Sequence, residues 1–407
     1  MRRTVVTRLS GSLLAAEEED GRITGLFLEP EGTESLVGRI YVGRVKSIVK
    51  NIRAAFLEFG RDEMCFYPLE EWEKHPLPGM EGKTLKEGDS LLIQIEKDAV
   101  KTKAPMATTC IIFAGQYLVL AAGKRGICFS SKIRDGARKQ ALKEFLTEAA
   151  DSAETSFPFG LIVRTNGKTA PYGAILSELE TLLKTASRIF SLWETRTAGT
   201  LLYEPEPAFL AEIFNNRTGS FGEVVTDDQT VYRLVEEKLK TLRAQDEACP
   251  LPALRLYGDS YPLSKLYSLE TALSKALSEK VWLKSGGSLI IQPTEALVSI
   301  DVNTGKFDGK KRLEETFFKI NLEAAAEIAV QLRLRNLSGI IIVDFIDMEE
   351  RDHKEQLLRV FAAALENDPV KVNLLGFTRL NLVELTRKKV RKPLHELLSG
   401  KRKDRKE

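Results

Sequence analysis

The stretch ALVSIDVNTG, residues 296–305, decides the architecture of the last third of the chain. An apolar, β-branched run ends there in Asp301, and Asn303 follows. A second run of the same shape, GIIIVD, ends in Asp344. Such runs predict buried strands, and the helical periodicity between and after them predicts an alternation of strands and helices. We expect strand, helix, strand and helix over Ser288–Asp301, Leu313–Arg335, Ser338–Asp344 and Asp352–Glu366, an α/β arrangement.

The two acids at the ends of these strands carry the main functional prediction. A charge that terminates a buried strand is costly unless it is paired, hydrogen-bonded or bound to a metal. Ligands of open α/β sheets bind beyond the carboxyl ends of the strands, so Asp301 and Asp344 can face one crevice. With the amide oxygen of Asn303 they form a set of hard oxygen ligands suited to Mg²⁺, which can activate water for attack on a phosphate. Alternatively, each acid caps the helix or turn that follows it.

Other polar residues near the second acid have less specific interpretations. Asp347, Glu349 and Glu350 either assist the site or cap the helix that begins near Asp352. His353 is one of three histidines and is more simply explained as a surface or helix-facing side chain. No histidine lies near a recognisable nucleophile motif, so Ser/His/Asp or Cys/His catalysis has little support.

The first part of the chain predicts a hairpin followed by a small barrel. Thr4–Thr7 and Arg22–Leu28 suggest two strands joined by a turn at residues 19–22. Closely spaced short strands then favour a closed or half-closed barrel; they cover Gly38–Val49, Ala54–Phe59, Met64–Tyr67 and Ser90–Lys97.

The middle of the chain predicts a mixed α/β segment. Strands are expected at Tyr117–Ala121, Gly160–Arg164 and Gly222–Thr226. Helices are expected at Gly136–Ala150, Ile175–Glu194, Ala208–Asn215, Asp228–Asp246 and, as one long helix, Pro262–Leu283.

Aromatic and basic residues alternate within the barrel candidate. Exposed aromatics can stack on bases while cations follow the backbone, as in OB-folds that bind single strands, although strand aromatics more often belong to a core. The set comprises Tyr41, Phe56, Phe59, Phe66 and Tyr67 among Arg39, Arg44, Lys46, Lys50 and Arg53. Farther on, GLIVRTNG (160–167) ends a strand with Arg164 and Thr165, a guanidinium and a hydroxyl that suit a terminal phosphate.

Composition sets broader limits. With 407 residues, 43% of them hydrophobic, and a net charge of +2, the chain is typical of a multidomain globular protein. Neither a secretory segment nor a membrane span is recognisable, so we expect a cytoplasmic location. The four cysteines show no C-x-x-C spacing and are expected to be reduced. The basic end from Arg387 to Glu407 either contacts phosphates or is a solvated tail.

Taken together, these motifs resemble the catalytic core of the ribonuclease E and ribonuclease G family. The resemblance covers nearly the whole chain in the right order. Its most specific segments are VSIDVNTGKF (298–307), NLEAAAEIAVQLRLRNLSGIIIVDFIDM (321–348) and LVELTRKK (382–389), with GRIYVGRV, AAFLEFG and GLIVRT upstream.

The resemblance implies a multidomain α/β fold. An RNase H-like subdomain would be formed by residues 1–35 and 207–280 and interrupted by an OB-fold of the S1 type at 36–116. A 5′-sensor region at 117–206, a DNase I-like catalytic domain at 281–398 and a basic tail at 399–407 would complete the chain.

The resemblance also implies the chemistry. Asp301 and Asp344 would bind Mg²⁺ and Asn303 would orient one of these groups or the scissile phosphate. The substrate would be single-stranded, A/U-rich RNA, cleaved to leave 5′-phosphate products during rRNA processing and mRNA decay. Phe56, Phe66 and Lys103 would grip RNA in the OB-fold, and the 5′-monophosphate would bind at Gly115, Val119, Arg164 and Thr165.

Two departures from the family pattern limit what is implied. Ser131 stands where a basic residue is usual in the 5′ pocket, which suggests weaker 5′ sensing. The paired-cysteine motif that joins subunits through zinc in longer members is not recognised, so any homodimer would form without that link. The alternatives that remain open are a non-catalytic RNA-binding protein of the same fold, and a magnesium-dependent phosphatase or DNA nuclease.

Overall fold

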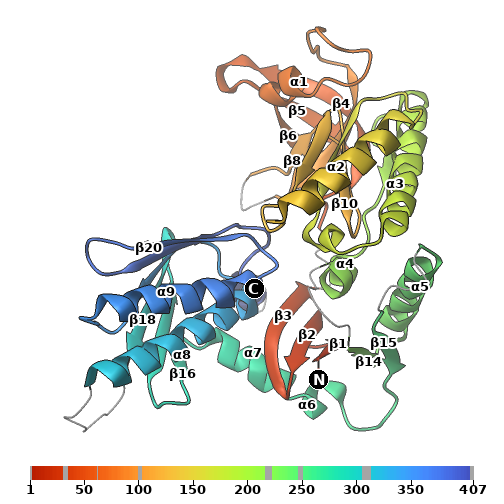
Figure 1. Cartoon of the computed structure of the whole chain (residues 1–407). Helices are drawn as coiled ribbons and strands as arrows, with labels where there is room; N and C mark the ends of the chain where they lie inside the picture. The colour runs from red at the N-terminus through yellow and green to blue at the C-terminus, as the bar shows by residue number, and fades with distance from the viewer. Residues whose placement is uncertain are drawn as a thin grey trace. The chain divides into compact units, whose positions relative to one another are not determined.

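The computed structural model describes residues 2–30, 35–61, 63–99, 103–215, 222–245, 251–304 and 313–403, which form two compact units (Figure 1). Unit 1 contains residues 1–32, 216–239 and 250–407. Unit 2 contains residues 33–215 and 240–249. In the described part of the chain no helix is long and apolar enough to cross a bilayer. The fold is mixed α/β, as expected.

Unit 2 begins with a closed five-stranded barrel. The pairing runs β4-β5-β6-β8-β7 and returns to β4, which removes both sheet edges. The strands are β4 (Ile40–Val49), β5 (Ala54–Phe59), β6 (Glu63–Pro68), β7 (Ser90–Lys97) and β8 (Met106–Thr108), with α1 (Leu69–Lys74) after β6 and β13 (Leu201–Tyr203) paired to β4. The four predicted barrel strands are confirmed.

The rest of unit 2 is a four-stranded sheet with helices. The strand order is β11-β12-β10-β9. The strands are β9 (Ile112–Ala114), β10 (Leu118–Ala122), β11 (Gly126–Phe129) and β12 (Phe159–Val163), and the helices are α2 (Gly136–Asp151), α3 (Tyr172–Leu192) and α4 (Ala208–Asn215). One apolar core, from Ile40 to Trp193, runs through barrel and sheet, which makes this unit a single packed body.

Unit 1 contains a five-stranded sheet in the order β15-β14-β1-β2-β3. Its strands are β1 (Arg2–Arg8), β2 (Ser12–Glu19), β3 (Arg22–Pro30), β14 (Glu223–Thr226) and β15 (Ala253–Leu256). The predicted two-stranded opening is wrong, because Ser12–Glu19 is a strand in spite of its acids. Arg3 donates to Glu18 at 3.0 Å, and Arg2 lies 3.5 Å from both Glu17 and Glu19, so the facing strand neutralises these acids.

The helices that follow differ in one place from the prediction. α5 (Gln229–Gln245) begins where the Asp228 side chain accepts the backbone N–H groups of Thr230 and Val231. The single long helix expected over residues 262–283 is wrong. The chain forms α6 (Leu263–Leu266), α7 (Leu269–Leu277) and the strand β16 (Lys280–Trp282), and Ser268 between the helices has a left-handed backbone with φ 51°.

The other sheet of unit 1 has six strands in the order β16-β17-β18-β19-β21-β20. With β16, its strands are β17 (Ser288–Pro293), β18 (Leu297–Asn303), β19 (Gly339–Asp344), β20 (Val372–Phe377) and β21 (Val383–Arg387). The strand expected over Ser288–Asp301 is therefore an antiparallel hairpin that turns at residues 294–296, and β20 and β21 were not predicted. Among the described strands of this sheet, β18 and β19 are the one parallel pair.

Two helices cover one face of this sheet. Figure 1 shows α8 (Leu313–Leu334) and α9 (Arg351–Glu366) side by side against the strands. Val298, Ile300 and Val302 of β18 belong to the core formed with these helices, whereas the alternate residues of the strand are more exposed. The sheet therefore has a covered face and an open face.

Neither interpretation of the basic end, phosphate contact or a solvated tail, holds for Arg387. Its side chain is 3% exposed and donates to the Asp368 carboxylate at 2.8 and 3.1 Å, and to Asn336 and Leu337. A buried guanidinium with four such bonds is a structural group. The final helix, α10 (Leu394–Lys403), is anchored by the buried Leu394, and the predicted tail beyond residue 403 lies outside the described residues.

Candidate active site

The two predicted acids are brought together by strand register. Asp301 is exposed near the end of β18 and is the Cα partner of Asp344 at the end of β19. Both side chains are exposed and lie on the open face of the sheet. Because β18 and β19 are parallel, both acids lie at the same edge, as the sequence predicted. Within the described residues, neither carboxylate accepts a backbone N–H at the start of a helix.

Asn303 lies on the same strand face, two residues beyond Asp301. Its amide Nδ2 donates to Asp301 Oδ2 at 2.6 Å. This bond fixes one oxygen of Asp301 and leaves the carboxylate with further acceptor sites. Asn303 and Asp301 are therefore in direct contact on this face.

A third acid contributes to the electrostatics. The pKa of Asp344 is raised above its ordinary value, first by burial and then by the negative charges of Asp301 and Asp347. Asp347 Oδ1 accepts a bond of 2.7 Å from Asn381 Nδ2, and Asn381 Oδ1 accepts one of 2.9 Å from Lys354 Nζ. Sequence reasoning missed Lys354 and also Asn381, which lies 34 residues beyond Asp347 in the chain.

This donor set suits a hard divalent cation. Within the described ranges no three His, Cys, Asp or Glu side chains group closely enough to hold a metal ion by themselves. Two carboxylates are nevertheless compatible with Mg²⁺, which keeps several of its own waters, and a cation between them would relieve the repulsion that raises the pKa of Asp344. The residues present fit magnesium.

Glu314 and His353 make contacts between two helices beside the acid pair. Glu314, at the start of α8, accepts the backbone N–H groups of Glu349 and Glu350 and a bond of 3.1 Å with His353 Nδ1. The His353 ring also stacks on Phe318 with centroids 4.2 Å apart. These contacts join α8 to the start of α9, so His353 is a packed, helix-facing side chain as predicted.

The predicted 5′-phosphate residues come from β10 and from the segments that directly follow β9 and β12 in unit 2. Arg164, directly after β12, donates through its guanidinium to the carbonyl oxygen of Gly115 and through its backbone N–H to Tyr117. Thr165 Oγ1 lies 3.0 Å from Ser130 Oγ. Gly115, Arg164 and Thr165 thus gather at one end of the sheet, while Val119 lies within β10, opposite Ile162. Ser131 is exposed, and its neighbour Ser130 is the residue that meets Thr165.

The buried acid Glu178 holds the backbone next to Gly115 and was missed by sequence reasoning. Its carboxylate accepts the backbone N–H groups of Gln116, Tyr117 and Leu118 at 2.7 to 2.8 Å. A Cβ at Gly115 would lie 2.4 Å from that carboxylate, so only glycine fits there. Burial raises the pKa of Glu178 and lowers that of Arg164, in each case against their mutual attraction. The sequence signal that could have indicated this role is the position of Glu178 among the apolar, buried residues of α3.

The predicted RNA-gripping residues lie on the barrel. Phe56 and Phe66 are Cα partners on β5 and β6, and their half-buried rings meet edge to face with centroids 6.0 Å apart. Lys103 is exposed and lies shortly before Pro105, whose carbonyl oxygen accepts the N–H of Phe66. By contrast, Tyr41, Phe59 and Tyr67 are at most 6% exposed and belong to the core.

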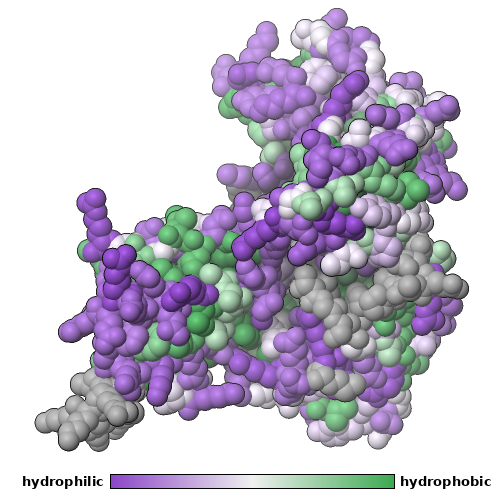
Figure 2. Space-filling model, in the orientation of Figure 1, coloured by the Kyte–Doolittle hydropathy of each residue, from purple (hydrophilic) through white to green (hydrophobic). Residues whose placement is uncertain are grey.

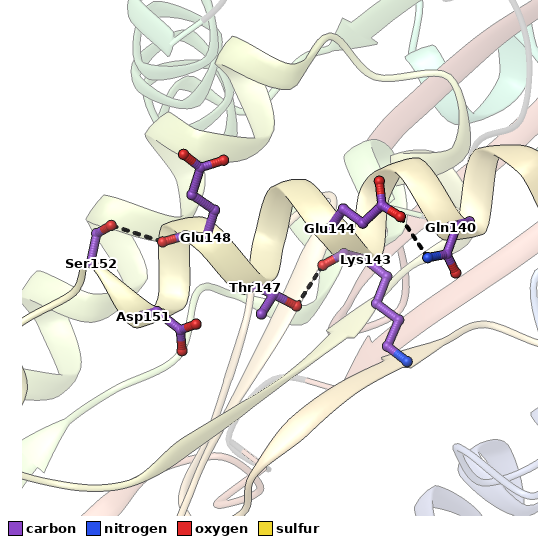
Figure 3. Close-up of a pocket in the computed structure, with 7 residues that line it drawn as sticks. All are labelled: Gln140, Lys143, Glu144, Thr147, Glu148, Asp151 and Ser152. Carbon is purple, nitrogen blue, oxygen red and sulfur yellow. Dashed lines mark hydrogen bonds between the residues drawn. The ribbon is translucent and has the colours of Figure 1, made fainter.

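A surface pocket elsewhere in unit 2 contains none of these residues. Figure 3 shows its lining side chains along α2 and its C-terminal cap, where they bond within the helix: Gln140 to Glu144 at 2.6 Å, Thr147 to the Lys143 carbonyl and Ser152 to the Glu148 carbonyl. A pocket lined by one helix brings no distant groups together, so it carries no catalytic assignment.

Comparison with known proteins points to one family. A model of the ribonuclease E/G family matches residues 112–390. Ribonuclease G of Salmonella typhimurium (strain SL1344) is 32% identical over 391 residues, which cover 93% of this chain and 78% of that protein. Ribonuclease G of Haemophilus influenzae gives the same identity and coverages over 393 residues, and ribonuclease E of Escherichia coli (strain K12) is 31% identical over 97% of this chain and 38% of its own length.

Proposed function

The chain belongs to the ribonuclease E/G family, and on that premise we propose that it is an endoribonuclease that cleaves single-stranded RNA with Mg²⁺ at Asp301 and Asp344. The observation that carries this proposal is the direct pairing of the two acids on parallel strands. The family argument favours RNA over a phosphatase or DNA substrate, and the acid pair favours cleavage over binding alone.

In this proposal the chain's own residues hold the reaction in place. Asp301 and Asp344 would hold the magnesium ion, and Asn303 keeps Asp301 in one orientation through its 2.6 Å bond. When bound, magnesium supplies Lewis acidity and a nucleophile derived from water at neutral pH. Asp347, held by Asn381, adds negative charge that favours cation binding. We propose A/U-rich target sites and 5′-phosphate products, as in the expectation from sequence.

The other predicted residues are proposed to bind RNA away from the cleavage site. Phe56, Phe66 and Lys103 of the barrel would hold the strand by stacking and charge. Gly115, Val119, Arg164 and Thr165 would receive a 5′-monophosphate. Because Arg164 already donates to Gly115, a phosphate would compete for or share that donor.

The finer architecture and the cellular role are also proposals. We assign an RNase H-like part to 1–35 and 207–280, the OB-fold to 36–116, the 5′ sensor to 117–206 and a DNase I-like domain to 281–398. The protein would act on mRNA and rRNA precursors in the cytoplasm, and as a homodimer if it associates.

One assay tests the proposal. A short single-stranded RNA with either a 5′-monophosphate or a 5′-hydroxyl is incubated with the protein in Mg²⁺ or in EDTA. We expect internal cleavage only with Mg²⁺, faster on the monophosphorylated RNA. Binding of the same RNA without cleavage under all conditions would favour the alternative, a non-catalytic RNA-binding protein. Equal cleavage rates on the two RNAs would exclude 5′ sensing but would leave the proposed cleavage activity intact.

A further inference from the structure

The six-stranded sheet of unit 1, here called the catalytic sheet, has an open face that extends from the acid pair to the edge strand β16. Register pairs link Lys280 to Ile290, Ile290 to Asp301 and Asp301 to Asp344 in one row. The next row links Trp282 to Ser288 and Ser288 to Asn303. Since paired residues point to the same side of a sheet, Lys280 and Trp282 share the face of Asp301 and Asn303.

Trp282 is unusual among the tryptophans of this chain. Its side chain is 67% exposed, whereas Trp72 and Trp193 are 8% and 6% exposed. Lys280 Nζ lies 3.9 Å from the centroid of its ring. A large aromatic surface left in water is a cost that a ligand can recover by covering it. Figure 2 shows that hydrophilic residues (purple) cover most of the drawn face of the molecule, with smaller hydrophobic areas (green) between them.

We propose that Trp282 and Lys280 form a binding subsite for one base of the RNA substrate, beside the site of cleavage. This inference rests on the proposed function of the acid pair. The indole offers a stacking surface and the ammonium group offers a charge for the adjoining phosphate, the pairing of groups that single-strand binders use. β16 and β18 are two strand spacings apart, roughly 10 Å, which an RNA strand covers in about three nucleotides.

Continuity with the acids identifies RNA as the occupant of this surface. Asp301, Asp344 and Asp347 repel phosphates in the absence of a metal ion, so the strand needs an attractive contact nearby on the same face. Lys280 is the cation that the register places there. A second copy of the chain is the competing occupant, and the test separates the two.

Tryptophan fluorescence provides a direct readout because the two other tryptophans are buried. The full chain carrying Asp301→Asn is titrated in EDTA with a short 5′-monophosphorylated single-stranded RNA. We expect RNA to quench the long-wavelength emission of Trp282, and Trp282→Phe to remove that signal. Trp282→Ala should weaken binding by about 5- to 150-fold, the range for one stacked base, and Phe should recover much of it. Tyr261→Ala, which removes another exposed aromatic (55%), is the matched control and should bind like the parent chain.

Cleavage kinetics and self-association complete the test. In the chain with both acids intact, Trp282→Ala should raise KM and leave kcat within about twofold. The subsite would be overturned if Trp282→Ala bound RNA with unchanged affinity and RNA did not quench the emission of Trp282. It would also be overturned if Trp282→Ala lost self-association, measured by sedimentation, but still bound RNA like the parent chain. These failures leave cleavage by the wild-type chain intact. Conversely, quenching by RNA without any cleavage would sink the proposed function and retain the subsite.

Discussion

Asp301 and Asp344 are register partners on the adjacent parallel strands β18 and β19, so two residues 43 positions apart in the chain share one edge of one sheet. The acids are exposed, and the backbones that carry them are held by a core in which Ile300 and Val343 are at most 1% exposed. Function at this edge is therefore separable from folding, and that separation leads to the first prediction.

Replacing either acid by its amide should stop cleavage while the fold persists. We expect Asp301→Asn and Asp344→Asn each to lower kcat by at least about 100-fold, because each removes one negative ligand of the proposed magnesium site. Circular dichroism and RNA affinity should change little. Asp259→Asn, which alters an exposed acid in the loop after β15, should keep full activity. Full activity of either active-site variant in Mg²⁺ would falsify the assignment.

The charge of Asp347 should be detectable in the titration of its neighbour. Burial and the charges of Asp301 and Asp347 raise the pKa of Asp344, so its charged form is disfavoured in the fold. The contribution of Asp344 to the free energy of unfolding is therefore most favourable below its unfolded pKa, where the carboxyl is protonated. That contribution is lost as pH rises through its folded pKa. We expect Asp347→Asn to lower the pKa of Asp344 in the metal-free protein, measured by carboxyl NMR. An unchanged pKa would show that Asp347 is too far away to matter.

The Glu178 carboxylate should support both stability and 5′ selectivity. Glu178→Ala leaves three backbone N–H groups without their acceptor, which should cost on the order of 3 kcal/mol in the free energy of unfolding. The preference for 5′-monophosphorylated RNA should also fall, because the loop that positions Gly115 against Arg164 is released. Glu180→Ala, on the exposed side of the same helix, is the control for denaturant titration and should cost less than about 0.5 kcal/mol. Equal stability of the two variants would refute this role.

The buried pair of Arg387 and Asp368 should be essential to the fold of the catalytic sheet and irrelevant to phosphate binding. Arg387→Ala removes the ion-pair partner of the buried Asp368 carboxylate and leaves it the backbone N–H of Val370; breaking a buried pair in this way typically costs about 3 to 5 kcal/mol. The exposed neighbour Lys389 can be changed to Ala as a control, with little loss of stability. If Arg387→Ala were as stable as wild type and only bound RNA less tightly, the structural interpretation would be wrong.

The cysteines should differ sharply in reactivity. Burial raises the pKa of the Cys65 thiol to about 12 and also raises that of Cys110, whereas Cys128 is exposed. We expect iodoacetamide at neutral pH to modify Cys128 in the folded protein and to leave Cys65 and Cys110 unmodified until the chain is unfolded. Peptide mass spectrometry reads each site separately. Rapid labelling of Cys65 under native conditions would contradict its burial.

Sequence pattern alone determined the features that depend on local periodicity and motif. The alternating runs predicted the barrel strands, and the two runs ending in Asp301 and Asp344 predicted strands with acids at one edge. Both predictions rest on local sequence, because a strand that buries one face has an apolar residue at every second position. The same reasoning failed for Ser12–Glu19, where three glutamates hide a strand whose acids pair with Arg2 and Arg3 of the facing strand.

Tertiary structure alone decided three other contacts between distant residues. The sequence gives no reason why Asn381 should hold Asp347, why Glu178 should satisfy the loop of Gly115, or why Arg387 should be buried against Asp368. These contacts depend on sheet order and helix packing, which bring together groups separated by 19 to more than 60 residues. They also decide the place of Trp282, which reaches the row of Asn303 only because β16 pairs with β17 and β17 with β18.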